Sequence, residues 1–223
     1  MSTPDRTRAR ALAAESAAAG DAVGWFETLY AEAAEGTAVV PWADLEPNPF
    51  LVPVIDALAV PTGGRAIVVG SGYGDDAAHL DALGWDVTAF DVSATSVRAA
   101  AERWAGRSIT WETCDVVAPF RGWLGAFDLV AEVYTVQVLP PGSTERAQSI
   151  VAIASLVAPG GTLAVVARAR GDDEPEGAFP WPLTRAEVES FAIGDLEARS
   201  IDLQVDTSEG DAVGRWVAVF RRT

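Results

Sequence analysis

The chain has 223 residues, of which 49 % are hydrophobic, so it can bury one substantial core. Sixteen basic residues against 32 acidic ones give a formal net charge of -16, which disfavours binding to nucleic acid or to an anionic membrane surface. All of the basic residues are arginines. Without lysine, the chain can form neither a lysine Schiff base nor a P-loop phosphate site.

The chain contains one cysteine, Cys114, and one histidine, His79. They cannot supply a zinc site or a Cys–His catalytic pair without help from carboxylates, and a single cysteine excludes an internal disulfide. No stretch reaches 18 consecutive apolar residues, the length that a membrane span needs. We therefore expect a soluble, cytoplasmic protein with no metal and no membrane partner; the oligomeric state stays open.

The first 60 residues predict a helical cover rather than a separate domain. Residues 9–19 have the composition of a helix that ends near Gly20, and a second helix is expected over Asp21–Glu35, where aromatic residues recur at helical spacing. Four prolines between residues 37 and 53 disfavour a long helix, so only a short one is expected over residues 50–58.

Residues 65–223 predict an α/β core within a single domain, 1–223. Short apolar runs alternate with helical segments, which is typical of a parallel sheet with helices on both faces. The predicted strands are residues 66–70, 86–91, 108–115, 126–133 and 162–169. Four helices are expected. Two cover residues 75–84 and 143–157, the second ended by Pro159-Gly160-Gly161. The other two begin after the predicted N-cap Ser93 and after the capping box formed by Thr184 and Glu187.

The C-terminal part differs from the rest because apolar residues alternate with polar ones over residues 196–206. Together with the apolar run at 215–222, this pattern predicts a β-hairpin that closes the sheet. The fold class is therefore a Rossmann-like, seven-stranded, mostly parallel sheet with a C-terminal antiparallel hairpin and an N-terminal helical cover.

Chemistry-bearing residues follow the ends of the predicted strands, where ligands bind in open α/β sheets. Gly70-Ser71-Gly72-Tyr73-Gly74 follows the first strand, and such a turn lets a ligand approach the backbone and its amide N–H groups. Asp91 ends the second strand, where a carboxylate can accept hydrogen bonds from ribose hydroxyls. Asp115 ends the third and can accept from an amino group such as that of adenine, while Glu132 and Tyr134 end the fourth.

The glycine turn, the acids after strands two and three, and the terminal hairpin together resemble the class I S-adenosylmethionine-dependent methyltransferases, whose sheet has a reversed last strand. The resemblance covers about residues 21–223 and implies S-adenosyl-L-methionine as cofactor. The segment WFETLYAEAAEGTAVVPWADLEPNPFLV is similar to the tryptophan-containing start of the thiopurine and thiol/halide methyltransferases. Like that group, the chain has no acid at Val68 and carries Asp75-Asp76 after the glycines, so the group that binds the methionyl ammonium stays open.

The resemblance implies two sets of site residues. Glu132 and Tyr134 fall at the family's acceptor-side position and are the candidate catalytic residues. Acids and aromatic faces favour a sulfonium cation, each aromatic contact by about 0.5–2 kcal/mol. The candidate cofactor-binding residues are Trp25, Tyr30, Trp42, Gly70, Ser71, Gly72, Gly74, Asp76, Asp91, Val92, Asp115, Val116 and Glu132.

We expect methyl transfer to a small-molecule acceptor, with a thiol as one candidate. A thiolate or halide needs no base, whereas an alcohol or amine would use a residue such as Glu132 or Asp44. Two alternatives remain: an NAD(P)-dependent oxidoreductase built on the same opening unit, and a binding module without turnover. Plain structural roles also remain for Trp25 and Trp42 as packing residues, and are favoured for His79 and Cys114.

Overall fold

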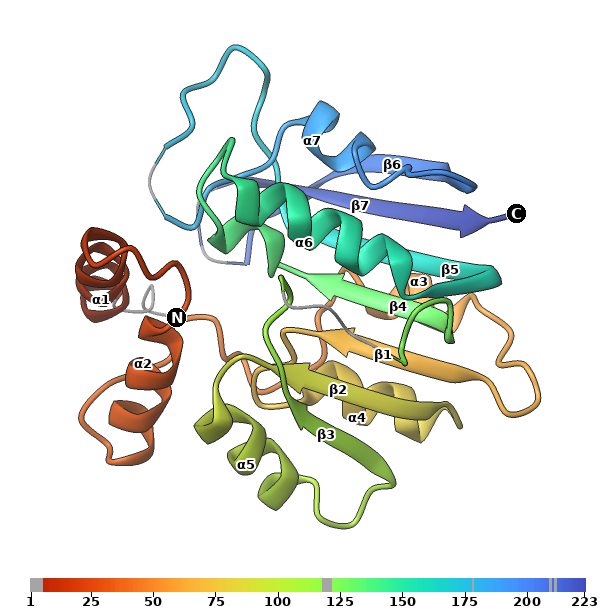
Figure 1. The fold of residues 1–223 in the computed structure, drawn as a ribbon, viewed down its shortest axis with the longest axis horizontal. Coiled ribbons are helices and arrows are strands. Elements are labelled where there is room, and N and C mark those ends of the chain that lie inside the picture. The colour runs from red at the N-terminus through yellow and green to blue at the C-terminus, as the bar shows by residue number, and fades with distance from the viewer. Residues whose placement is uncertain (1–5, 118–121, 178, 209, 211) are drawn as a thin grey trace.

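A seven-stranded sheet forms the centre of the computed structural model, which describes residues 6–117, 122–177, 179–208, 210 and 212–223 (Figure 1). The strand order is β3-β2-β1-β4-β5-β7-β6. The strands are β1 (Arg65–Val69), β2 (Asp86–Asp91), β3 (Ile109–Thr113), β4 (Phe127–Val133), β5 (Val157–Arg168), β6 (Leu196–Asp206) and β7 (Val213–Arg222). The chain order reverses between β1 and β4, and such switch points are where α/β sheets bind ligands.

Strands β1 to β5 are parallel, and β7 pairs antiparallel with both β5 and β6. This confirms the predicted mostly parallel sheet with its C-terminal hairpin. Because β7 runs backwards, its first residues lie beside the last residues of β5: Arg215 is paired with Arg168. Residues of β7 therefore reach the edge at which β1, β2 and β4 end.

Helices cover both faces of the sheet (Figure 1). Residues of α6 (Thr144–Ser155) and α7 (Arg185–Glu189) join the apolar cluster on one face, and residues of α3 (Val52–Asp56) and α4 (Asp75–Ala82) join the cluster on the other. Helix α5 (Ala94–Arg103) packs on β2 and β3, and a 3-10 turn, η1 (Val136–Val138), follows β4. Helices α1 (Thr7–Ala18) and α2 (Trp25–Ala34) lie beyond the carboxyl ends of the parallel strands.

The caps expected from the sequence are present. The Ser93 hydroxyl accepts from the Ser96 N–H at the start of α5, and Thr184 and Glu187 form both hydrogen bonds of a capping box at α7. The expected end of α6 is wrong, because the helix stops at Ser155 and β5 already begins at Val157. Pro159-Gly160-Gly161 instead lie within β5, where the pairing with β4 shifts register. No helix in the described part of the chain has the length and apolar character that a membrane crossing requires.

Candidate cofactor and acceptor site

The glycine turn between β1 and α4 has the left-handed backbone that glycine permits. The φ angles are +61° at Gly70, +53° at Gly72 and +83° at Gly74. Its amides, however, bond within the protein. The Ser71 N–H donates to the Phe90 carbonyl (2.8 Å), that of Gly72 to the Asp91 carboxylate (2.9 Å) and that of Gly74 to the Ser71 carbonyl (2.9 Å). The expectation that the turn directs its amides at a ligand is therefore wrong for these three groups.

The missing side chains of this turn allow other residues to pack against it. A Cβ atom on Gly70 would collide with the Thr135 hydroxyl, and one on Gly74 would collide with the Trp111 ring. A Cβ atom on Gly72 would lie 3.2 Å from the Tyr30 hydroxyl of α2. The turn thus brings β4 and the N-terminal cover close to the ends of β1 and β2.

Asp91 lies at the centre of the site, at the last position of β2. It is 6 % exposed, and its carboxylate accepts from the N–H of Gly72 (2.9 Å) and of Ser93 (3.0 Å). Val92, between Asp91 and Ser93 in the chain, is half-buried. Burial raises the pKa of Asp91, and the backbone hydrogen bonds oppose that shift. Two carboxylate oxygens offer about four lone pairs, so capacity remains for hydroxyl donors.

Glu132, near the end of β4, is fully buried. Its Oε1 accepts from the N–H of Thr135 (2.7 Å) and of Val136 (2.9 Å), which holds the turn into η1. Burial raises its pKa to about 7. Because the side chain is buried and one of its oxygens holds a turn, the geometry favours a role in positioning or cofactor binding over that of a general base.

Two polar atoms next to this turn lack partners. Neither Glu132 Oε2 nor Ser71 Oγ has a hydrogen-bond partner among the described residues, although both are buried. Glu132 is in register with Val69 at the end of β1, and Ser71 follows Val69 by two residues, so both residues lie close to the carboxyl end of β1. Buried polar atoms without partners are costly, and here they mark a place that a polar ligand group would satisfy.

Tyr134, directly after β4, has a left-handed backbone with φ of +59°, which is uncommon outside glycine and occurs at functional sites. Its ring lies 5.4 Å from the guanidinium carbon of Arg215 on β7. Burial raises the pKa of its hydroxyl, and the Arg215 charge together with a hydrogen bond to the Asn48 side chain opposes that shift. Tyr134 therefore lies between the cover and the C-terminal hairpin.

The aromatic candidates of the cover differ in whether they contact the glycine turn. Trp25 is buried, with its ring stacked 3.9 Å from that of Phe26 and edge-on to Trp42 at 5.9 Å. Tyr30 is buried against the glycine turn, and its hydroxyl accepts from the indole N–H of half-buried Trp42 (3.2 Å). The structure thus places Tyr30 and Trp42 next to the turn, whereas Trp25 packs mainly among aromatic rings.

The remaining acids have mainly structural contacts. The Asp76 carboxylate accepts from the Asn48 N–H (2.7 Å), and burial raises the pKa of Asp76 to about 6. This contact ties the cover to α4. Asp115 accepts from the Val117 N–H (3.0 Å) in a local turn beside buried Val116, and its second oxygen has no hydrogen-bond partner among the described residues.

The sequence did not identify Glu27 of α2, which ties the cover to the turn after Asp91. Its carboxylate accepts from the Ser93 hydroxyl (2.6 Å) and from the hydroxyl (2.6 Å) and N–H (3.1 Å) of Thr95. Burial alone would raise the pKa of Glu27, but these hydrogen bonds lower it below its ordinary value. Arg215 was missed as well; both residues find their partners through the fold, and no local pattern indicates them.

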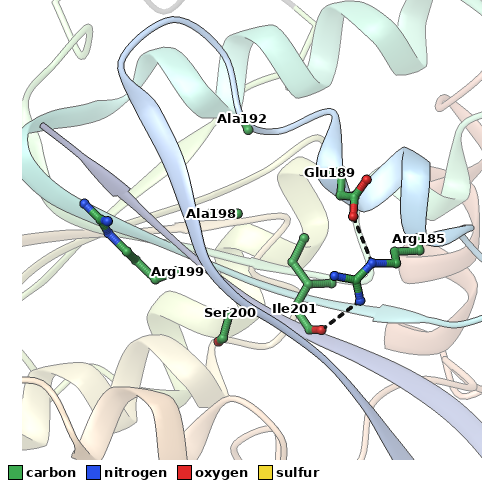
Figure 2. Close-up of a pocket in the computed structure, with 7 residues that line it drawn as sticks. All are labelled: Arg185, Glu189, Ala192, Ala198, Arg199, Ser200 and Ile201. Carbon is green, nitrogen blue, oxygen red and sulfur yellow. Dashed lines mark hydrogen bonds and ion pairs between the residues drawn. The ribbon is translucent and has the colours of Figure 1, made fainter.

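A separate hollow lies between α7 and the first half of β6 (Figure 2). Arg185 donates to Glu189 (2.8 Å) and to the Ile201 carbonyl (3.1 Å), as the dashed lines show. Arg185 and Glu189 belong to α7 and Ile201 to the amino half of β6, away from the glycine turn. The hollow is lined by Arg185, Glu189, Ala192, Ala198, Arg199, Ser200 and Ile201, and it gathers none of the predicted site residues.

Comparison with known proteins agrees with this geometry. Residues 66–161 match a family model described as a methyltransferase domain. N-methyltransferase NodS from Bradyrhizobium japonicum WM9, solved with S-adenosyl-L-homocysteine, superposes with a TM-score of 0.67 at 20 % identity, over 88 % of this chain and 98 % of that one. The chain has a methyltransferase fold.

Other solved structures are similar to the chain at comparable identity. One is a structure from work on the conversion of a disulfide bond into a thioacetal group during echinomycin biosynthesis. It superposes with a TM-score of 0.71 at 21 % identity, over 88 % of this chain and 92 % of that one. Magnesium protoporphyrin IX methyltransferase from Synechocystis PCC 6803, with bound S-adenosylmethionine, gives 0.58 at 18 %, over 78 % and 76 %. No curated protein sequence matches the chain. The narrower likeness to thiopurine and thiol/halide methyltransferases stays a prediction.

Proposed function

We propose that the protein binds S-adenosyl-L-methionine at the carboxyl ends of β1, β2 and β4 and transfers its methyl group to a small-molecule acceptor. Asp91 carries this proposal, since its carboxylate is fixed by two backbone N–H groups beside the glycine turn and retains capacity for ribose hydroxyls. The family match supports the reaction class, and the cofactor complexes of two proteins with this fold support the ligand.

The residues around the turn fit the parts of this cofactor. Asp91 suits the ribose, and the second oxygen of Asp115 suits the adenine amino group. Glu132 Oε2 and Ser71 Oγ, which are buried without described partners, suit the methionyl ammonium, so Glu132 provides the acid that Val68 lacks. The sulfonium is favoured beside the aromatic rings that flank the turn, Tyr30 and Trp42.

When bound, the cofactor supplies an activated methyl group: an electron pair of the acceptor bonds to the methyl carbon as the methyl–sulfur bond breaks, and S-adenosylhomocysteine leaves. The chain contributes alignment and the exclusion of water, which account for much of the rate of such displacements. Glu132 is buried and holds a turn, so we assign it to binding, and we assign Tyr134 to orientation of the acceptor. A thiolate acceptor, which needs no base, suits this site best.

The observed topology disfavours the oxidoreductase alternative. Dinucleotide-binding sheets of the Rossmann type have the strand order 3-2-1-4-5-6, whereas here an antiparallel strand, β7, is inserted between β5 and β6. The remaining alternative is a module that binds the cofactor without turnover. Because fold alone does not determine function, activity must be measured.

Calorimetric titration with S-adenosylhomocysteine tests the proposal. We expect the wild-type chain to bind and Asp91→Ala to weaken binding at least tenfold, whereas Asp86→Ala, at the exposed opposite end of the same strand, binds normally. Incubation with isotope-labelled methyl donor and a panel of thiols, phenols, amines and halides, read by mass spectrometry, then tests transfer. Absence of binding at millimolar ligand refutes the proposal, and binding without transfer to any acceptor favours the binding module. Thermal protection by NADH but not by S-adenosylhomocysteine favours the oxidoreductase.

We further propose that residues 1–60 form the cover of one domain with residues 65–223. The contacts of Glu27 with Ser93 and of Asp76 with Asn48 support this assignment. The single cysteine favours a cytoplasmic location, which imaging of a tagged chain would check.

A further inference from the structure

Arg215 is a buried arginine at the carboxyl edge of the parallel strands whose donors are only partly used. The residue is 7 % exposed, and its Nη2 donates to Asp206 on β6 at 2.8 Å. Its Nε and Nη1 are buried with no hydrogen-bond partner among the described residues. A guanidinium carries five N–H donors, and buried charged groups are almost always hydrogen-bonded. The side chain therefore retains capacity for a second anion.

A second arginine lies beside it. Arg168, the last residue of β5, is directly opposite Arg215 in the antiparallel pair, so both side chains project from the same face of the sheet. Like charges at opposed positions destabilise a sheet unless negative charge lies close to them. Asp206 forms an ion pair with Arg215. The negative charges of Asp206 and Asp44 also raise the pKa of the nearby Tyr134 hydroxyl.

The position of Arg215 suits the acceptor rather than the cofactor. Two strand spacings, about 10 Å, separate β7 from β4. The guanidinium extends back over the ring of Tyr134, the first residue after β4. The glycine turn and Asp91 lie on the other side of β4, after β1 and β2. An anionic group held by Arg215 would therefore place the rest of its molecule across the end of β4.

We propose that Arg215 binds a carboxylate of the methyl acceptor, so that the substrate is a small molecule bearing a carboxylate apart from the atom that is methylated. This inference rests on the proposed methyltransferase function and specifies its substrate class. Because Arg215 is nine-tenths buried, the carboxylate reaches it only when the Tyr134 ring or the adjoining cover segment shifts. The resulting ion pair is largely desolvated, which strengthens it.

Matched acceptors test this proposal. The probes are thiosalicylate, salicylate and anthranilate, each compared with its own methyl ester, so that sulfur, oxygen and nitrogen acceptors are tested with and without the negative charge. Release of S-adenosylhomocysteine is the readout. We expect at least one acid to exceed its ester by about 10- to 100-fold in kcat/KM, which corresponds to a hydrogen bond to a charged group.

Three variants assign that preference to Arg215. Arg215→Gln should reduce the acid-to-ester ratio to about 1, mainly through a higher KM for the acid. Arg215→Lys, which keeps a point charge without the planar fork, should give an intermediate ratio and serves if the glutamine variant fails to fold. Arg199→Gln removes an exposed arginine of β6 and should leave the ratio unchanged.

The outcomes separate the two proposals. A wild-type protein that binds S-adenosylhomocysteine but methylates no acid faster than its ester overturns the acceptor assignment and leaves the cofactor assignment intact. An acid preference that survives in Arg215→Gln also overturns the acceptor assignment. A wild-type protein that does not bind S-adenosylhomocysteine overturns both.

Discussion

If Glu132 binds the methionyl ammonium, cofactor binding must release a proton near neutral pH. The pKa of Glu132 in the free protein is about 7, so about half of the molecules carry a proton on this carboxyl at pH 7. An ammonium beside Oε2 stabilises the ionised form and lowers that pKa. Binding should therefore release up to about 0.5 proton at pH 7, about 0.9 at pH 6 and about 0.03 at pH 8.5.

The affinity for S-adenosylhomocysteine should follow the same ionisation. The ionised fraction of Glu132 falls from about 0.9 at pH 8 to about 0.09 at pH 6, so the binding constant should fall about tenfold over that range. Calorimetry in phosphate and in Tris, whose ionisation enthalpies differ, yields the number of protons released. Glu132→Gln should lower affinity by about 10- to 100-fold through loss of a charged hydrogen bond and should remove this part of the proton release.

Other buried carboxyls do not obscure this comparison. The pKa values of Asp76 and Asp91 are also raised by burial, but both residues are present in the wild type and in the variant, so their contributions cancel in the difference. Glu112→Gln, at an exposed position of β3, is the matched control and should behave as wild type. Equal proton release by the wild type and Glu132→Gln would refute the assignment of the ammonium to Glu132.

The free protein and its cover give three further predictions. Because the pKa of Glu132 is raised, it destabilises the fold as pH rises from about 4.5 through 7; Glu132→Gln should remove that slope in urea denaturation measured between pH 5 and pH 8. Gly72→Ala should reduce the free energy of unfolding more than Gly36→Ala. Both residues have a left-handed backbone, which costs an alanine about 1–2 kcal/mol, but only a methyl group at Gly72 would also meet Tyr30. Equal losses in the two variants would contradict this account. Folding lowers the pKa of Glu27, so its carboxylate stabilises the fold at pH values above its ordinary pKa, and this contribution disappears as pH falls through the lower pKa of the folded protein. Glu27→Gln should therefore lower the melting temperature at pH 7 and match wild type in acid. A difference in melting temperature that stays constant across pH would argue against the hydrogen bonds to Ser93 and Thr95.

Local chemistry explains which features were predictable. The strand from Asp86 to Asp91 was predicted with its observed bounds, because apolar residues run up to an acid and Ser93 follows as a helix cap. The order of apolar runs and the alternating C-terminal segment likewise predicted the sheet and its hairpin. These elements depend on neighbours in sequence, so their patterns are visible without the fold.

The partners within the site were not predictable, because they join distant segments. The Gly72 amide is used by Asp91, 19 residues away, and Glu27 reaches Ser93 across 66 residues. The sequence placed Glu132 at the end of the fourth strand but could not show that one of its oxygens holds a turn while the other lacks a described partner. Arg215 gains its place through the reversed direction of β7.

A pair of rings joins the N-terminal cover to the loop after β5. Trp25 of α2 meets Phe179 of the loop after β5 edge-on, at 5.0 Å between ring centroids. An aromatic pair of this kind contributes about 0.5–1.5 kcal/mol beyond the burial of its surface, and Trp25 is only 3 % exposed. Any motion of the cover away from the loop after β5 would therefore expose Trp25 surface to water as well as break the ring contact.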